Sequence, residues 1–203
     1  MSESPIVADH ADPILPGLWS WTIGDPRIGG FASTSHALAT DDGVVLIDPH
    51  RLAPDALAGL GKVTVIVLAC GPHQRSAWHY RRELGVPVYA PQGLEQIYET
   101  PDHSYGDGET LPGGLRTVFA PGPGTKQYVL LSAGDPKILF AADHFVHPPG
   151  GELGLVSDEY IDDPAQTRET VKGLLDLDFD VLCTGHGPPI TDDPKSAIRA
   201  LVS

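Results

Sequence analysis

The chain has 203 residues, of which 41% are hydrophobic, so it is long enough to bury one sizeable core. Its 27 Asp and Glu residues outnumber 13 Lys and Arg, and the net charge of -14 disfavours nucleic-acid phosphates and anionic membranes as partners. No stretch approaches the ~20 apolar residues of a membrane span and residues 1–13 lack a signal-peptide pattern, so we expect one soluble, cytoplasmic domain over 1–203.

The first half of the chain reads as short strands with helices between them. Asp42-Gly43 is typical of a hairpin turn, Pro54 of a helix start, and Gly85 of a helix end. We expect strands over 14–23, 31–39, 44–47, 63–68 and 86–90, and helices over 54–59 and 75–84. The last two strands and the helix between them predict a parallel βαβ unit.

The second half continues the pattern with longer loops. Asp163 and Pro164 mark a helix start, and Val171, Leu174 and Leu175 follow at helical spacing. We expect strands over 115–119, 128–131, 138–141 and 180–186, and helices over 94–98, 164–175 and 194–201. Cys70 and Cys183 lie in or beside apolar runs, and the composition is not that of a disulfide scaffold, so both read as free thiols.

Polar residues follow apolar strands at four places. The stretches are "VVLIDPH" (44–50), "GPHQRS" (71–76), "KILFAADHFVH" (137–147) and "VLCTGHGPP" (181–189). Strand ends are rigid platforms on which side chains can converge, so they suit metal ligands and general bases. This pattern predicts a functional site where these four stretches meet.

The sequence resembles the metallo-β-lactamase-fold superfamily over nearly its whole length. Five blocks carry the resemblance: "GVVLIDP", "VIVLACGPH" leading into "RRELGVPVYAP", "FAPGPGTKQYVLL", "KILFAADHF" and "DFDVLCTGHGPPI". It implies an α/β fold, a four-layer αββα sandwich of two mixed sheets with outer helices. It also implies hydrolysis of esters, thioesters, lactams or phosphoesters with one or two metal ions.

The family's metal motif H-x-H-x-D-H has two possible placements here. Counted from the strand side, its slots fall on Cys70, Pro72, Gln74 and Arg75, which gives no metal site. Counted from the helix end, its last three ligand slots fall on Cys70, Pro72 and His73. We prefer the second placement, because packing fixes helix and strand lengths whereas loops tolerate deletion.

Under this placement the resemblance leaves one reduced metal site. Pro123 replaces the histidine of the family's P-G-H motif, and His73, Asp143 and His186 remain as metal ligands, with Asp143 and His186 as catalytic residues. Two imidazoles and a carboxylate suit one divalent ion, zinc first and iron or manganese as alternatives. Because a second ion lacks its ligands, we expect one tightly bound metal at most, or none.

Several other residues near these motifs have plainer interpretations. We expect Asp48 to orient a ligand, Cys70 to be a small buried hydrophobic residue, and three loop histidines to be solvated. Those three, His50, His144 and His147, and also Cys70, stay open as replacements for the lost ligands. The sequence leaves the oligomeric state open.

Two classes of function remain from the sequence. The first is a metal-dependent hydrolase of reduced metal content that acts on a small ester, thioester or lactone. The second is a catalytically silent member that keeps the fold as a binding module. The joint presence of His73, Asp143 and His186 favours the first.

Overall fold

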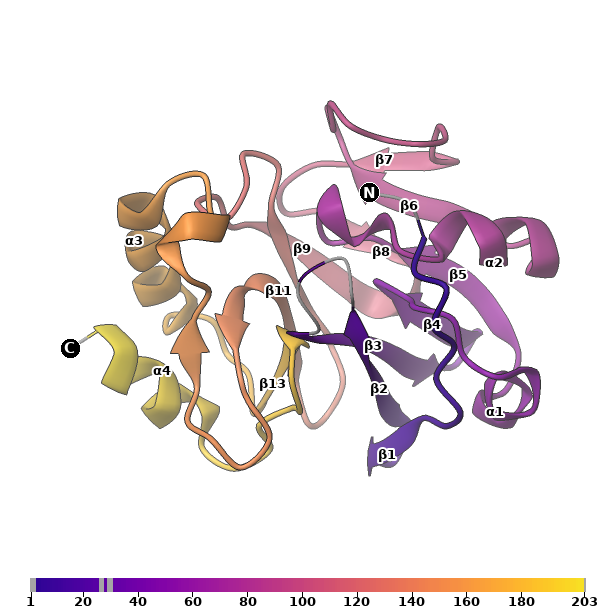
Figure 1. The fold of residues 1–203 in the computed structure, drawn as a ribbon, viewed down its shortest axis with the longest axis horizontal. Coiled ribbons are helices and arrows are strands. Elements are labelled where there is room, and N and C mark those ends of the chain that lie inside the picture. Colours follow the sequence, from indigo (N-terminus) through magenta and orange to yellow (C-terminus); the bar gives the residue numbers. More distant parts are fainter. Residues whose placement is uncertain (1–2, 26–27, 29–30, 203) are drawn as a thin grey trace.

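The computed structural model describes residues 3–25, 28 and 31–202 (Figure 1). These residues form two mixed β-sheets packed face to face, with helices on both outer faces. Helices α1 (Pro54–Leu60) and α2 (Ala77–Leu84) cover the first sheet, and α3 (Pro164–Leu174) and α4 (Pro194–Val202) cover the second. The predicted four-layer αββα sandwich is confirmed.

The first sheet comes from the N-terminal half of the chain and has the same order in space as in sequence. Its strands are β1 (Asp12–Leu15), β2 (Leu18–Asp25), β3 (Phe31–Thr40), β4 (Gly43–Ile47), β5 (Val63–Val67), β6 (Val88–Pro91) and β7 (His103–Tyr105). Neighbours from β1 to β4 are antiparallel, and those from β4 to β7 are parallel. The predicted βαβ unit is β5, α2 and β6.

The second sheet has the order β12-β11-β10-β9-β8, and β13 pairs in parallel with β11. Its strands are β8 (Thr110–Leu111), β9 (Leu115–Phe119), β10 (Tyr128–Leu131), β11 (Ile138–Val146), β12 (Gly154–Leu155) and β13 (Val181–His186). The short 3-10 helices are η2 (Pro72–Gln74), η3 (Pro112–Gly114) and η4 (Asp158–Tyr160). Parallel pairing brings the ends of β11 and β13 to the same edge, which is the edge that carries the site.

Three apolar clusters hold the four layers together. Val45, Val67 and Phe140 are among the buried residues between the two sheets. Leu46 and Ile66, on the other face of the first sheet, pack with Trp78 of α2. A third cluster joins the second sheet to α3 and α4; it includes Leu139, Leu182, Val171, Leu174 and Ile198. Because both faces of each sheet are buried, their central strands read as continuous apolar runs.

The helix that begins at Pro164 forms as the sequence predicts. The Asp163 carboxylate accepts a hydrogen bond from the Gln166 amide, and Pro164 occupies the first turn, where no amide hydrogen is needed. Val171 and Leu174 then face the second sheet. Local capping and long-range packing therefore favour the same helix.

Three predicted elements differ in the structure. The expected strand over 14–23 is two strands, because the chain turns at Pro16-Gly17. The expected helix over 94–98 is absent, because the side chain of Gln74 bonds the Gln96 carbonyl and the Tyr98 amide and so satisfies groups that a helix would pair. Strand β11 continues five residues past its expected end at Ala141, as far as Val146.

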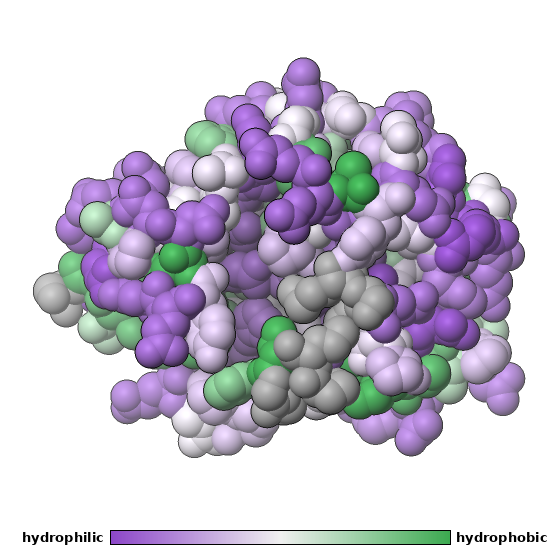
Figure 2. Space-filling model, turned by 45° about the horizontal axis from the view of Figure 1, so that its top comes forward, coloured by the Kyte–Doolittle hydropathy of each residue, from purple (hydrophilic) through white to green (hydrophobic). Residues whose placement is uncertain are grey.

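The surface is mainly polar on the face shown in Figure 2. Hydrophilic residues dominate the described part of this face, and hydrophobic residues occur on it in small separate groups. Large contiguous apolar patches mark interaction sites, so this face gives no such signal. Among the described helices, none has the length and apolar character that would let it cross a lipid bilayer.

Candidate functional site

The four predicted strand ends meet at one edge of the sandwich. Asp48 follows β4, His73 lies in η2 after β5, Asp143 lies in β11, and His186 ends β13. Two of these side chains come from the first sheet and two from the second. The four stretches therefore meet at one edge, as the sequence predicts.

The two predicted histidines converge on one carboxylate oxygen. Nε2 of His73 lies 2.8 Å from Oδ1 of Asp143, and Nε2 of His186 lies 2.9 Å from the same atom. The two rings stand edge to face, with their centroids 5.8 Å apart. The structure thus brings together all three residues predicted as metal ligands.

The far side of each imidazole is held by an acceptor. His73 Nδ1 donates to Oδ2 of Asp48 at 2.9 Å, and His186 Nδ1 donates to the carbonyl oxygen of Ala32 at 2.8 Å. These partners place a hydrogen on each Nδ1, so in the neutral form of either ring Nε2 carries a lone pair. Two lone pairs and a carboxylate oxygen then face one another, and such a set requires a proton or another cation between its members.

Asp48 is itself fixed by the backbone. Its Oδ1 accepts a hydrogen bond from the Ala69 amide at 2.9 Å, while Oδ2 binds His73. The residue has a φ of 47°, a conformation that non-glycine residues rarely adopt. Strained residues cluster at functional sites, and this one orients an imidazole in the way that carboxylates orient metal-binding histidines.

The three proposed ligands differ in how far their side chains are exposed to solvent. The His73 side chain is 5% exposed, whereas those of Asp143 and His186 are 19% and 17% exposed. Burial tends to raise the pKa of Asp143, but the two imidazoles outweigh it and hold that pKa well below its usual range. Asp143 is therefore an ionised and partly exposed carboxylate.

The pKa of His73 is raised well above its ordinary value. Burial and the Arg75 cation act to lower it, and the carboxylates of Asp143 and Asp48 act in the opposite direction and prevail. In a site without metal, a proton on Nε2 of His73 therefore lies between this imidazole and Asp143.

Cys70 also reaches the site from the core between the sheets. The residue is 1% exposed, as expected of a small buried hydrophobic side chain, yet its Sγ donates to Oδ2 of Asp143 over 3.6 Å. The ligand atoms of Cys70, His73 and Asp143 all lie within 4.8 Å of one another. Burial raises the pKa of this thiol to about 11, so it would bind as a thiolate only where a metal displaces its proton.

The structure adds one residue that our sequence analysis did not select, Arg75. Its Nη2 lies 3.1 Å from Nε2 of His73, and its Nη1 donates to the carbonyl oxygen of Asp48 at 2.9 Å. The residue is 6% exposed and has a φ of 39°. One signal was available: Arg75 occupied the last slot of the motif placement that we rejected because it gave no metal ligands.

The histidines left open as replacement ligands lie elsewhere. His50 and His144 are fully buried, so the expectation that they are solvated is wrong. His50 Nε2 pairs with the Ser33 hydroxyl at 2.7 Å, and His144 Nε2 pairs with the Ala120 carbonyl at 2.9 Å. His147 is half-buried and its Nδ1 donates to the Pro188 carbonyl. The group of ligand atoms around Asp143 includes none of the three.

His36 lies behind the site and makes folding sensitive to acid. Burial, and then the charge of Arg75, lower its pKa to about 3 from 6.5. Because the unfolded chain binds this proton below pH 6.5 and the folded chain does not, stability is full above 6.5 and falls as the pH decreases toward 3.

We expect the free energy of unfolding to fall by about 2 kcal/mol between pH 7 and 5 through this histidine alone. In His36→Gln the free energy of unfolding should fall by that much less between pH 7 and 5, although the variant is less stable overall. Urea titrations of both proteins at both pH values measure the difference. An equal loss in the two proteins would contradict the assignment.

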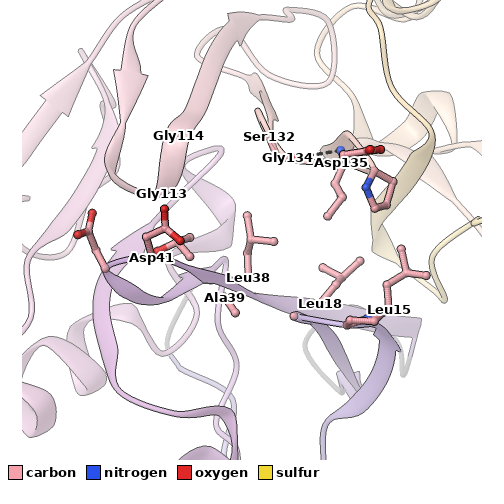
Figure 3. Close-up of a pocket in the computed structure, with 16 residues that line it drawn as sticks. Leu15, Leu18, Leu38, Ala39, Asp41, Gly113, Gly114, Ser132, Gly134 and Asp135 are labelled. Atoms are coloured by element: carbon pink, nitrogen blue, oxygen red, sulfur yellow. Dashed lines mark hydrogen bonds between the residues drawn. The ribbon is translucent and has the colours of Figure 1, made fainter.

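A larger hollow lies at the opposite edge of the sandwich (Figure 3). Its volume is about 410 Å³, and its lining joins apolar residues such as Leu18 and Leu38 to the acidic Asp41 and Asp135. The residues that line it include no histidine or cysteine. This cavity therefore does not share the chemistry of the cluster around Asp143.

Comparison with known proteins gives one family. Residues 14–203 match the model of the metallo-beta-lactamase superfamily. A comparison with curated protein sequences found no match.

Solved structures of the same fold resemble the chain over most of its length. A metallo-beta-lactamase from Pontibacter korlensis is 19% identical, with a TM-score of 0.75 over 95% of this chain and 98% of that one. The metallo-beta-lactamase FIM-1 from Pseudomonas aeruginosa, in a mono-zinc form, is 16% identical, with a TM-score of 0.74 over 97% and 94%. TTHA1623, in a di-iron-bound form, is 21% identical, with a TM-score of 0.64 over 79% and 90%. The match of the family model over residues 14–203 shows that the chain belongs to the metallo-beta-lactamase superfamily.

Proposed function

We propose that this chain is a metal-dependent hydrolase that holds one divalent ion at His73, Asp143 and His186 and acts on a small ester, thioester or lactone. One observation carries the proposal. Nε2 of both histidines points at the same oxygen of Asp143, and each Nδ1 is tied to an acceptor. Histidines that bind metals in proteins are oriented in this way.

The donor set fits the proposed ion. Two neutral imidazoles and one carboxylate suit zinc, iron or manganese and leave coordination positions for water. When bound, such an ion supplies an acidified water and polarises a carbonyl group. The mono-zinc form of FIM-1 and the di-iron form of TTHA1623 support either metal for this fold. We favour zinc, with iron or manganese as alternatives.

The residues around the centre have separate tasks in this proposal. Asp48 holds the His73 ring in position, and the Ala32 carbonyl holds that of His186. Asp143 is partly exposed and remains ionised, so it can bind the ion and accept a hydrogen bond from a water molecule beside it. The limited exposure of Asp143 and His186 favours a small substrate, and the net charge of -14 disfavours polyanionic ones.

A second function, that of a silent binding module, is favoured by Arg75. Its guanidinium contacts Nε2 of His73 and supplies a positive charge to the cluster without any metal. In this case the protein keeps the fold without the reaction, and His73 and His186 serve as hydrogen-bonding groups.

Metal removal separates the two functions. We expect untagged protein to contain at most one zinc, iron or manganese ion per chain, and to hydrolyse at least one class in a panel of esters, thioesters, lactones and phosphoesters. A chelator should abolish that activity, and added metal should restore it. Two ions per chain would contradict the single site, and a lack of turnover with every metal would favour the binding module.

A further inference from the structure

Arg75 places a buried cation against the imidazole that the proposed metal would use. Nη2 lies 3.1 Å from Nε2 of His73 and donates to the Gly185 carbonyl at 3.3 Å. Nη1 donates to the carbonyl oxygens of Thr34 and Asp48. The guanidinium therefore donates hydrogen bonds to backbone carbonyl groups of both sheets.

The contact with Nε2 excludes a metal from the same lone pair. An imidazole nitrogen has one lone pair, so it cannot accept a hydrogen bond from Arg75 and bind a metal ion at once. Where Nε2 carries a proton instead, that proton must leave before a metal binds, and the nearby guanidinium still repels the ion. In both protonation states, Arg75 opposes a metal at His73.

The charges of the cluster lead to the same conclusion. Among the described residues, the carboxylates of Asp48 and Asp143 both contact His73, and the guanidinium of Arg75 contacts the same imidazole. A divalent ion beside these two carboxylates and the guanidinium leaves one positive charge in excess. Without the guanidinium, a divalent ion balances the two carboxylates.

We propose that Arg75 is a resident cation of this centre that weakens metal binding at His73. In the metal-free form the guanidinium contacts Nε2 of His73, and it must move away from this nitrogen when a metal binds there. Its backbone conformation, with a φ of 39°, is one that persists only where the surroundings impose it, as at functional sites. The inference concerns the metal site of the proposed function and does not depend on hydrolysis.

Zinc affinity of variants at Arg75 tests the inference. The full chain is stripped with a chelator and titrated with zinc against a chromophoric competitor, and circular dichroism checks the fold. We expect Arg75→Met to bind zinc at least about tenfold more tightly than the wild type, the lower end of the effects known for groups around metal ligands. Arg75→Lys keeps the charge and should bind more weakly than Arg75→Met.

Two further variants complete the test. Arg81→Met is the matched control, because Arg81 pairs with Asp102 at the surface and its loss changes the net charge by the same amount. It should bind zinc as the wild type does. If Arg75→Met does not fold, Arg75→Gln keeps an amide donor for the Thr34 and Asp48 carbonyls, and the same gain is expected.

A folded neutral variant that binds zinc no more tightly than the wild type would overturn the inference. So would an equal gain in Arg81→Met, since the effect would then come from net charge alone. Tighter zinc binding by Arg75→Met without turnover of any substrate would support the inference while contradicting the proposed hydrolase. The two proposals can therefore fail separately.

Discussion

Replacement of Asp143 by alanine is expected to abolish both metal binding and hydrolysis. The substitution removes the charged ligand on which both imidazoles converge and leaves two neutral nitrogens. Two imidazoles alone bind a divalent ion weakly. Loss of a group that only orients a ligand already costs about 10–100-fold in affinity or activity, so we expect a decrease of at least about 100-fold in each.

Two companion variants make this result specific. Asp143→Asn keeps the shape of the side chain but removes its charge. Its metal affinity and activity should fall nearly as much as those of Asp143→Ala. Asp41→Ala removes an exposed carboxylate at the opposite edge of the sandwich and should leave zinc affinity and turnover unchanged. Activity that survives Asp143→Ala in a folded protein would show that the reaction does not use this centre.

Replacement of Gly187 by alanine is expected to be the most damaging change to stability that we describe. Gly187 has a φ of 115°, and a Cβ there would lie 1.7 Å from the carbonyl oxygen of His147. Neither backbone can move freely, since the His147 amide donates to the carbonyl of His186 and the Gly187 amide donates to Thr34. We expect a loss of more than about 3 kcal/mol, beyond the cost of a strained backbone alone.

Gly85→Ala is the control that separates backbone strain at a positive φ from a steric clash of the new Cβ. Gly85 ends α2 with a φ of 67°, but a Cβ there meets nothing within 4 Å. Its replacement should cost only about 1–2 kcal/mol, the penalty of the left-handed conformation. Urea unfolding of both variants gives the comparison, and similar midpoints would contradict the role of the His147 contact.

The sequence predicted the layers of this fold because their signals are local or repeated. Capping by Asp163 and the apolar runs of the central strands can be read without knowledge of partners. The absence of a helix at 94–98 could not be predicted in this way. Its hydrogen bonds are replaced by those of the Gln74 side chain, which lies more than twenty positions away from the groups that it binds. Long-range bonds of this kind override local propensity.

In the site, too, some features could be predicted from the local sequence and others depend on distant residues. The positions of Asp48, His73, Asp143 and His186 followed from strand ends, whereas the burial of His144 depended on the continuation of β11 to Val146. The place of Arg75 depended on a positive φ and on carbonyl groups of distant strands. Neither feature has a signature in the residues next to it.

The bond between His186 and the Ala32 carbonyl has a consequence for synthesis of the protein. These residues are 154 positions apart, and Arg75 and Gly185 are 110 apart. Contacts between distant segments slow folding, because the intervening chain must be ordered before they form. Until β13 has been made, the nascent chain lacks His186 and has no complete centre. An ion that needs all three proposed ligands can therefore be held only after residue 186 has been added.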